Sequence, residues 1–242
     1  MEDFIDRVSS LRDLGIILSD DGRFEKHIEK VMSKVRQKVG RMMRTFYTRR
    51  KDIMVQLWKT LAQCYVDYCS QQYMRGQGQA MQAIKKLVYD FTSKIPGVRE
   101  ENYWSRLITL KMYSQERRME RYRIIYIWKK LENPAPNCGV NLAPENERLG
   151  RRCQIPKLKS QGRQAIQTLR EQSFQINGAR IYNSLPKILR TIPGIQNKFK
   201  YELDKLLTNI TDHPRLGQLA PSATFRITGK HSNSFTAWIK EK

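Results

Sequence analysis

The apolar residues of the N-terminal third recur with the periods of a short strand and then of long helices. Leu14, Ile16 and Leu18 alternate with their neighbours as in a buried strand, and Asp20-Asp21-Gly22 has the composition of a turn. From Phe24 onward, apolar residues return at steps of three and four, the pattern of one buried helical face. On this first helix they are Phe24, Ile28, Val31, Val35, Val39, Met42, Met43 and Phe46.

The same steps predict further helices. A second helix follows Asp52, a third ends at Pro96-Gly97, and others are expected at residues 104–110, from Ser114, and at 174–185 and 195–207. The fold class is therefore mainly α, a bundle of about five helices with a short N-terminal β strand. Residues 152–170 read either as a small β hairpin or as an arm that becomes ordered only on nucleic acid. On the second helix the expected inward residues are Met54, Leu57, Trp58, Leu61, Tyr65 and Tyr68.

Composition divides the chain into five predicted segments. Residues 1–22 hold the strand and turn, and residues 23–132 form a basic helical domain. Residues 133–150 have the Pro and Gly content of a linker. Residues 151–207 form a basic region with two helices, and residues 208–242 a poorly ordered tail.

The charge balance points to an anionic partner. The chain has 45 Lys and Arg against 23 Asp and Glu, a formal net charge of +22. Such an excess indicates nucleic acid or an anionic membrane surface. No apolar run reaches the ~18 residues of a membrane span, and acidic Glu2, Asp3 and Asp6 do not suit a signal peptide. We therefore expect an intracellular protein, nuclear or cytoplasmic, whose four cysteines are reduced thiols.

One face of the first helix is basic. Lys26, Lys30, Lys34, Lys38 and Arg41 follow one line of helical steps, and no acidic residue occurs between Glu29 and Asp52. At ~1.5 Å rise per residue this ridge is roughly 22 Å long, enough to follow several phosphates. The alternative is a solvated face that only keeps the chain soluble, but such faces usually interleave both signs.

A second basic group is expected on the helix that begins near Ser114. Exposed arginines beside Tyr122 and Tyr126 would suit phosphate contacts combined with stacking on bases or sugars. An interpretation at least as good is that the tyrosines lie in the core and the arginines are merely solvated. With Met119, these two tyrosines are expected to face inward. The arginines are Arg117, Arg118, Arg121 and Arg123.

Catalytic and metal sites find little support. Asp20 and Asp21 beyond a strand could serve a two-metal polymerase site, but a turn that caps the next helix explains both. Cys64, Cys69 and His27 could hold zinc, yet paired short-spaced ligands are missing. We predict no cofactor, no metal and no enzyme activity for this chain by itself.

Several stretches, in the same order, resemble the end of a LINE-type (non-LTR, jockey-like) retrotransposon reverse transcriptase. LGIIL at residues 14–18 resembles the passage from palm to thumb, and YVDYCSQ at 65–71 the second thumb helix. IPG at 95–97 and YNSLP at 182–186 resemble later blocks of that family. The resemblance spans roughly residues 11–207. It departs at Cys64, where the family usually has proline, and at Tyr73 and Tyr182, where it usually has tryptophan.

The family's catalytic carboxylates lie upstream of the LGIIL strand, so the resemblance implies a non-catalytic fragment that grips the backbone of a template–primer, whether RNA, DNA or a hybrid. His27 matches the family's helix-entry histidine, and we expect it to be structural. The other interpretation is a retrotransposon-derived host protein that uses its helices for protein contacts, with a partner covering the N-terminal strand. The expected nucleic-acid-binding residues are Lys30, Lys34, Lys38, Arg41, Arg44, Arg117, Arg118, Arg121, Arg151 and Arg152.

Overall fold

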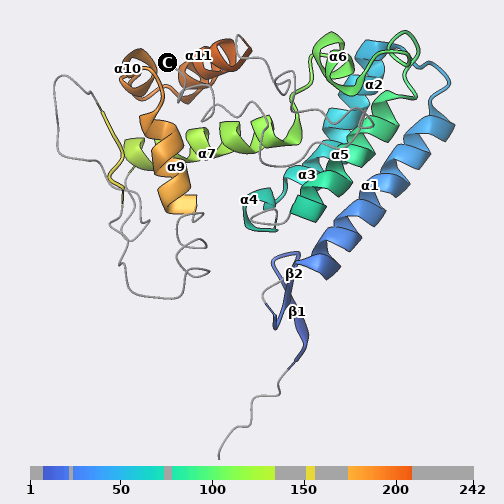
Figure 1. Cartoon of the computed structure of the whole chain (residues 1–242), viewed down its shortest axis with the longest axis horizontal. Coiled ribbons are helices and arrows are strands. Elements are labelled where there is room, and N and C mark those ends of the chain that lie inside the picture. The colour runs from blue at the N-terminus through green and yellow to red at the C-terminus, as the bar shows by residue number, and fades with distance from the viewer. Residues whose placement is uncertain (1–7, 22–23, 74–77, 134–150, 156–173, 209–242) are drawn as a thin grey trace, which may run out of the picture. The chain divides into compact units, whose positions relative to one another are not determined.

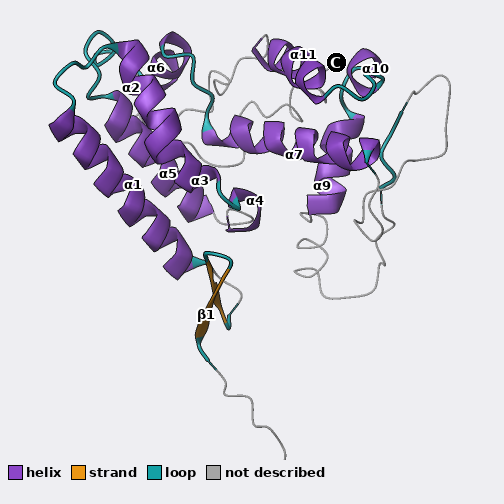
Figure 2. Ribbon diagram, turned by 180° about the vertical axis from the view of Figure 1, so that it is seen from behind, coloured by secondary structure: helices purple, strands orange, loops and turns teal. Residues whose placement is uncertain are grey.

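The computed structural model describes residues 8–21, 24–73, 78–133, 151–155 and 174–208. They are mainly helical, with a two-stranded antiparallel sheet near the N-terminus, which confirms the predicted class (Figure 1 and Figure 2). The chain divides into two compact units, residues 1–112 and residues 113–242. The basic domain predicted over residues 23–132 spans this division.

The N-terminal element is a hairpin. Strands β1 (Ser10–Asp13) and β2 (Ile16–Ser19) pair antiparallel, with Leu11 opposite Leu18. Leu14 and Gly15 form the turn, and both have positive φ, 44° and 87°. A two-residue turn of this hand matches the twist of its strands. The predicted strand over residues 14–18 was therefore wrong at its start. Its mostly exposed partner was missed because β1 shows no apolar alternation.

The long basic helix is present as α1 (Glu25–Thr45), seen in blue in Figure 1. Its predicted apolar face is largely confirmed, because Val31, Val35, Val39 and Met42 are buried. Phe46 follows the helix and is 39% exposed. The buried face of α1 packs against β2, the second helix and α5 (Gly78–Thr92).

The second helix is continuous but irregular. It consists of α2 (Lys51–Leu57), the π-helical turn η1 (Trp58–Ala62) and α3 (Gln63–Asp67). A π turn accommodates one more residue than an α turn. The inward face after η1 therefore moves on by one position. Ala62 and Val66 are buried in place of Leu61 and Tyr65, and the prediction for those two residues was wrong.

Trp58 anchors this irregular turn. Its ring is fully buried and lies 4.7 Å from that of Phe91 on α5, measured between centroids. Its indole Nε1 donates a hydrogen bond of 2.7 Å to Gln63 Oε1, and Gln63 Nε2 donates to Asp67 Oδ1 at 2.9 Å. The polar atoms that the turn carries into the core are thus paired with each other, as burial requires.

The rest of the first unit completes its core. Short α4 (Ser70–Tyr73) follows α3, and α5 leads through a turn at Pro96-Gly97 into α6 (Tyr103–Thr109). The side chain of Asn102 caps α6 by accepting the Ser105 N–H. The apolar residues expected at the core of the third helix are buried, apart from Met81, which is half-buried: Ile84, Leu87, Val88, Phe91 and Ile95.

The second unit is built around α7 (Gln115–Glu132), whose first turn is capped by Ser114. α7 packs against α9 (Phe174–Asn183) and α11 (Gln196–Thr208), and short α10 (Lys187–Arg190) packs against α11. Trp128 and Phe199 stack with centroids 4.7 Å apart. Met119 is buried and Tyr122 half-buried, but Tyr126, expected to face inward, is 41% exposed.

Several predictions concern residues outside the described part of the chain. These are most of the predicted linker, the hairpin or arm beyond residue 155, and the tail beyond residue 208. At residues 151–155, Cys153 is buried in the core of the second unit. The side-chain amide of Asn183 pairs with both backbone groups of Cys153, at 2.8 Å each.

Deleting Lys59 tests whether η1 is a one-residue insertion in an otherwise regular helix. Removing this exposed residue would turn the π turn into an α turn while Met54, Trp58, Ala62 and Val66 keep one face. We expect the free energy of unfolding, from urea titration, to change by about 1 kcal/mol or less. Deleting exposed Gln37 from regular α1 is the control, and it should remove most of the stability by rotating Val39 and Met42 out of the core. Equal losses in both variants would contradict the interpretation.

Candidate nucleic-acid interface

The displaced register of α3 places Tyr65 beside the basic face of α1. Its ring is half-buried, and the ammonium groups of Lys34 and Lys38 lie 5.6 and 5.9 Å from its centroid. Each such contact contributes about 0.5–1 kcal/mol at an exposed site. An aromatic ring flanked by cations combines stacking and phosphate contacts, as single-stranded nucleic-acid sites do.

Five of the cations on α1 have no acidic partner among the described residues. Lys34, Arg41 and Arg44 are exposed, and Lys30 and Lys38 are half-buried. Within the part of the chain that the structure describes, none of these five makes an ion pair. A helix of 21 residues is ~32 Å long, so the face offers positive charge over a length comparable to several nucleotides.

His27 joins the hairpin to α1. It is 3% exposed, and its Nδ1 accepts a hydrogen bond from the Ile17 N–H at 3.4 Å. Burial is the main cause that lowers the pKa of His27, and the charges of Lys30 and Lys34 lower it further. A buried, neutral imidazole that accepts from β2 has a structural role at the strand–helix junction.

Tyr68, expected in the core, fastens the tip of the hairpin instead. Its ring is 50% exposed, and its hydroxyl donates to the Leu14 carbonyl oxygen at 2.6 Å. The orientations of Tyr65 and Tyr68 were missed because no periodicity analysis reveals a π turn. The run of helical residues without a Gly or Pro gives no local sign of it.

The structure corrects the prediction made for Arg117. It was expected to be exposed, but its side chain is 1% exposed, and its Nη1 lies 3.7 Å from Glu120 Oε2 within α7. The cause is that α7 is covered on more than one side, so its buried face is wider than a single apolar stripe. At this exposure the guanidinium is not accessible to a phosphate in the structure.

Two other arginines of α7, Arg118 and Arg121, have partners within the second unit. Arg118 Nη2 donates to the Tyr122 hydroxyl at 2.7 Å. Arg121 forms a bidentate pair with Asp204 at 2.5 and 2.8 Å, which joins α7 to α11. The hydrogen bond from this guanidinium to Asp204 raises the pKa of Arg121.

The two candidate arginines after the predicted linker, Arg151 and Arg152, are half-buried in the second unit. Arg151 pairs with the Glu132 carboxylate and donates to the Leu131 carbonyl oxygen. Arg152 is half-buried, and its charge, after burial itself, helps to lower the pKa of Arg190. Among the described residues, the five candidates on α1 and Arg152 make no ion pair, and the five on α1 are the ones gathered on a single helix.

The other candidate groups of this region are two carboxylates and two thiols. Asp20 and Asp21 are exposed beyond β2. Among these residues, no three His, Cys, Asp or Glu side chains are grouped so that they could hold a metal ion. Cys64 and Cys69, which with His27 were considered as zinc ligands and not predicted to bind it, are free thiols. None of the helices described here has both the length and the apolar character needed to cross a membrane.

Comparisons with protein-family models, with curated proteins and with solved structures found no match to this chain.

The lowered pKa of His27 predicts a pH-dependent stability. The unfolded chain binds a proton below about pH 6.5, whereas buried His27 resists it, so stability is full above that pH and falls as the pH drops. From pH 7.5 to 5.5 the free energy of unfolding should decrease, by at most about 1.4 kcal/mol per pH unit from this group. His27→Asn keeps a hydrogen-bond acceptor without titrating, and urea titrations of it should be flatter. Identical pH dependence in both proteins would contradict the assignment.

Proposed function

We propose that the chain is a non-catalytic nucleic-acid-binding protein that grips the backbone of RNA, DNA or an RNA–DNA hybrid along α1. In this proposal it acts as the thumb and C-terminal part of a retrotransposon RNA-directed DNA polymerase would. The ordered resemblance across residues 11–207 supports the origin. The geometry of α1 and α3 supports the mode of binding.

The observation that carries the proposal is the contact of Tyr65 with Lys34 and Lys38, on an α1 face that has no acidic partner among the described residues. A face that served solubility alone would interleave both signs. Here several like charges lie on one helical face, and their mutual repulsion is relieved when an anionic polymer binds. Backbone binding of this kind does not depend on base sequence.

A second candidate function rests on the hairpin. Three of its apolar side chains are exposed, Leu14 at 83%, Leu11 at 58% and Leu18 at 39%, while Ile16 and Ile17 are half-buried. An exposed two-stranded ribbon with unpaired edges can accept another strand or an apolar surface. This favours a protein partner at residues 10–19, for a retrotransposon-derived protein that uses its helical fold for protein contacts.

The first function predicts binding that is steep in salt. With labelled RNA–DNA hybrid, duplex DNA and single-stranded RNA, fluorescence anisotropy at 50 and 200 mM salt should show affinity falling several hundred-fold if about five phosphates are contacted. Changing Lys34, Lys38 and Arg41 together to Glu should remove most of the binding and reduce the salt slope by about 2.7 on duplex DNA, about 0.9 per lost contact.

A matched variant separates the α1 face from total charge. Arg36, Lys59 and Lys86 are exposed and lie on three different elements, and changing them to Glu alters the net charge by the same amount. This control should retain affinity within a few-fold. Equal losses in the two triple variants, or binding that salt hardly affects, would contradict a grip by α1 and leave the protein-contact function.

A further inference from the structure

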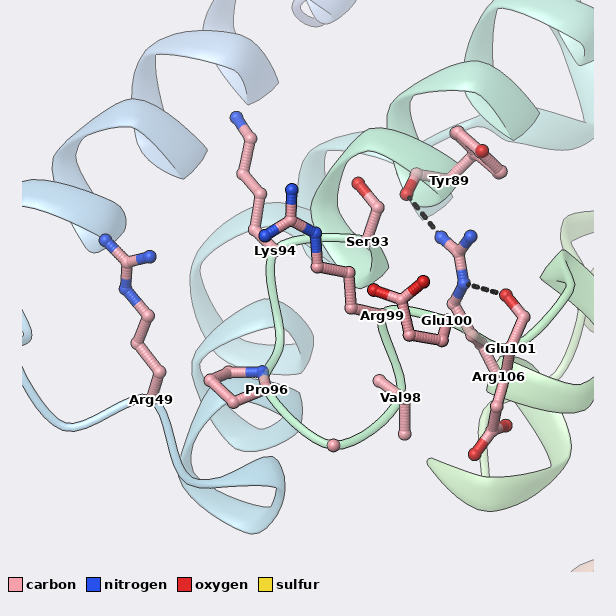
Figure 3. Close-up of a pocket in the computed structure, with 11 residues that line it drawn as sticks. Arg49, Tyr89, Ser93, Lys94, Pro96, Val98, Arg99, Glu100, Glu101 and Arg106 are labelled. Atoms are coloured by element: carbon pink, nitrogen blue, oxygen red, sulfur yellow. Dashed lines mark hydrogen bonds between the residues drawn. The ribbon is translucent and has the colours of Figure 1, made fainter.

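A second cation-lined site lies in the first unit, where the loop between α5 and α6 meets the segment between α1 and α2. A cavity of about 1010 Å³ opens there (Figure 3). Its charged lining comes from Arg49, Lys94, Arg99, Glu100, Glu101 and Arg106. Its exposed cations, Arg49, Lys94 and Arg99, lie outside α1.

Arg106 is a buried lining residue of the cavity, held by hydrogen bonds to two backbone carbonyl groups. It is 4% exposed, its Nε donates to the Glu101 carbonyl oxygen at 2.7 Å, and its Nη1 donates to the Tyr89 carbonyl oxygen at 3.4 Å. Its guanidinium also lies 4.5 Å from the centroid of the Tyr89 ring. One buried side chain thus ties the loop to the end of α5, as Figure 3 shows.

The turn of the loop requires glycine. Gly97 has a φ of 78°, and a Cβ built there would lie 3.1 Å from Cε of Lys51. A residue with a side chain would therefore be strained and would displace Lys51. The Pro96-Gly97 turn and Arg106 together fix the short loop in which Lys94 precedes the turn and Arg99 follows it.

Three of the four cations around the cavity make no ion pair in the part of the chain that the structure describes. Arg49, Lys94 and Arg99 are exposed, and within the described residues they make no ion pair. Figure 3 shows the Lys94 and Arg99 head groups together on one side of the loop, with that of Arg49 facing the same space. Like charges gathered at a concave surface attract an anion.

Two carboxylates in the lining reduce the net positive charge of the cavity. Glu101 accepts a hydrogen bond from the Thr109 hydroxyl at 2.9 Å, and the Glu100 carboxylate lies beside the Arg99 side chain in Figure 3. Four cationic side chains and two carboxylates line the cavity, which leaves a formal charge of +2. A phosphate monoester carries about −1.5 to −2 at pH 7 and so complements it, whereas a phosphodiester carries only about half as much.

We propose that this cavity binds a phosphate monoester through Arg49, Lys94 and Arg99. Arginine guanidinium groups suit it because they bind phosphate oxygens bidentately, and lysine adds a point charge. The ligand is a free phosphate compound or the phosphorylated end of a nucleic-acid strand. Either source presents the same dianionic group, and neither needs the α1 face.

The test uses the full chain and two probes. Isothermal titration calorimetry with inorganic phosphate reports the free group, and anisotropy compares one labelled oligonucleotide with a 5′-phosphate or a 5′-hydroxyl. We expect Arg99→Ala to weaken phosphate binding about ten-fold or more, the loss of a charge-assisted hydrogen-bonded contact. Glu100→Gln should strengthen it several-fold by removing repulsion. Arg36→Ala, on exposed α1 surface, is the charge-matched control and should change it less than two-fold.

The outcomes separate the two sources and the two functions. Calorimetric binding of phosphate indicates the free compound, and preference for the 5′-phosphate alone indicates a strand end. If the α1 triple variant binds nucleic acid as well as the wild type while phosphate binding still depends on Arg99, the proposed grip by α1 is wrong and the phosphate site stands. Absence of any preference for phosphate in both assays, or equal losses in Arg99→Ala and Arg36→Ala with unchanged circular dichroism, would overturn the proposal.

Discussion

The packing of Trp58 decides which surface the first unit presents. Its ring fills the space beside Phe91, and its indole donates to Gln63 in the next turn, so the helix widens into a π turn. Everything after that turn is rotated by one residue. Val66 enters the core, and Tyr65 leaves it to lie beside Lys34 and Lys38. The aromatic part of the candidate interface is thus a consequence of how one tryptophan is buried.

The two units use their positive charge differently. In the second unit, arginines hold helices and loops together, as in the pairs Arg121–Asp204 and Arg151–Glu132. Their charge is compensated within the fold, and losing them would affect folding before binding. On α1 and around the cavity at Arg49 and Arg99, cations have no such partners among the described residues. Uncompensated charge on a rigid scaffold supports binding, since no internal pair must be broken first.

The sequence predicted the helices well where their periodicity is regular. The buried faces of α1 and α5 follow the three- and four-residue steps, because each packs one apolar stripe on the core. Prediction failed where tertiary contacts decide. Leu61 and Tyr65 were misplaced by the π turn, and Leu14 was assigned to a strand although it forms a turn. Arg117 looked exposed by type but is buried, since α7 is covered on more than one side. Charge counts identified α1 as a basic surface, but they could not distinguish it from the paired arginines of α7.

Photocrosslinking with mass spectrometry tests the central claim most directly. Irradiation of the full chain bound to an RNA–DNA hybrid, without any added crosslinker, would form covalent bonds at the side chains that contact bases and sugars. We expect a crosslink at Tyr65 that Tyr65→Phe keeps and Tyr65→Ala removes, because the ring itself makes the contact. Crosslinks confined to residues 113–208, with none between Lys30 and Tyr68, would contradict the assignment of the interface to α1 and α3.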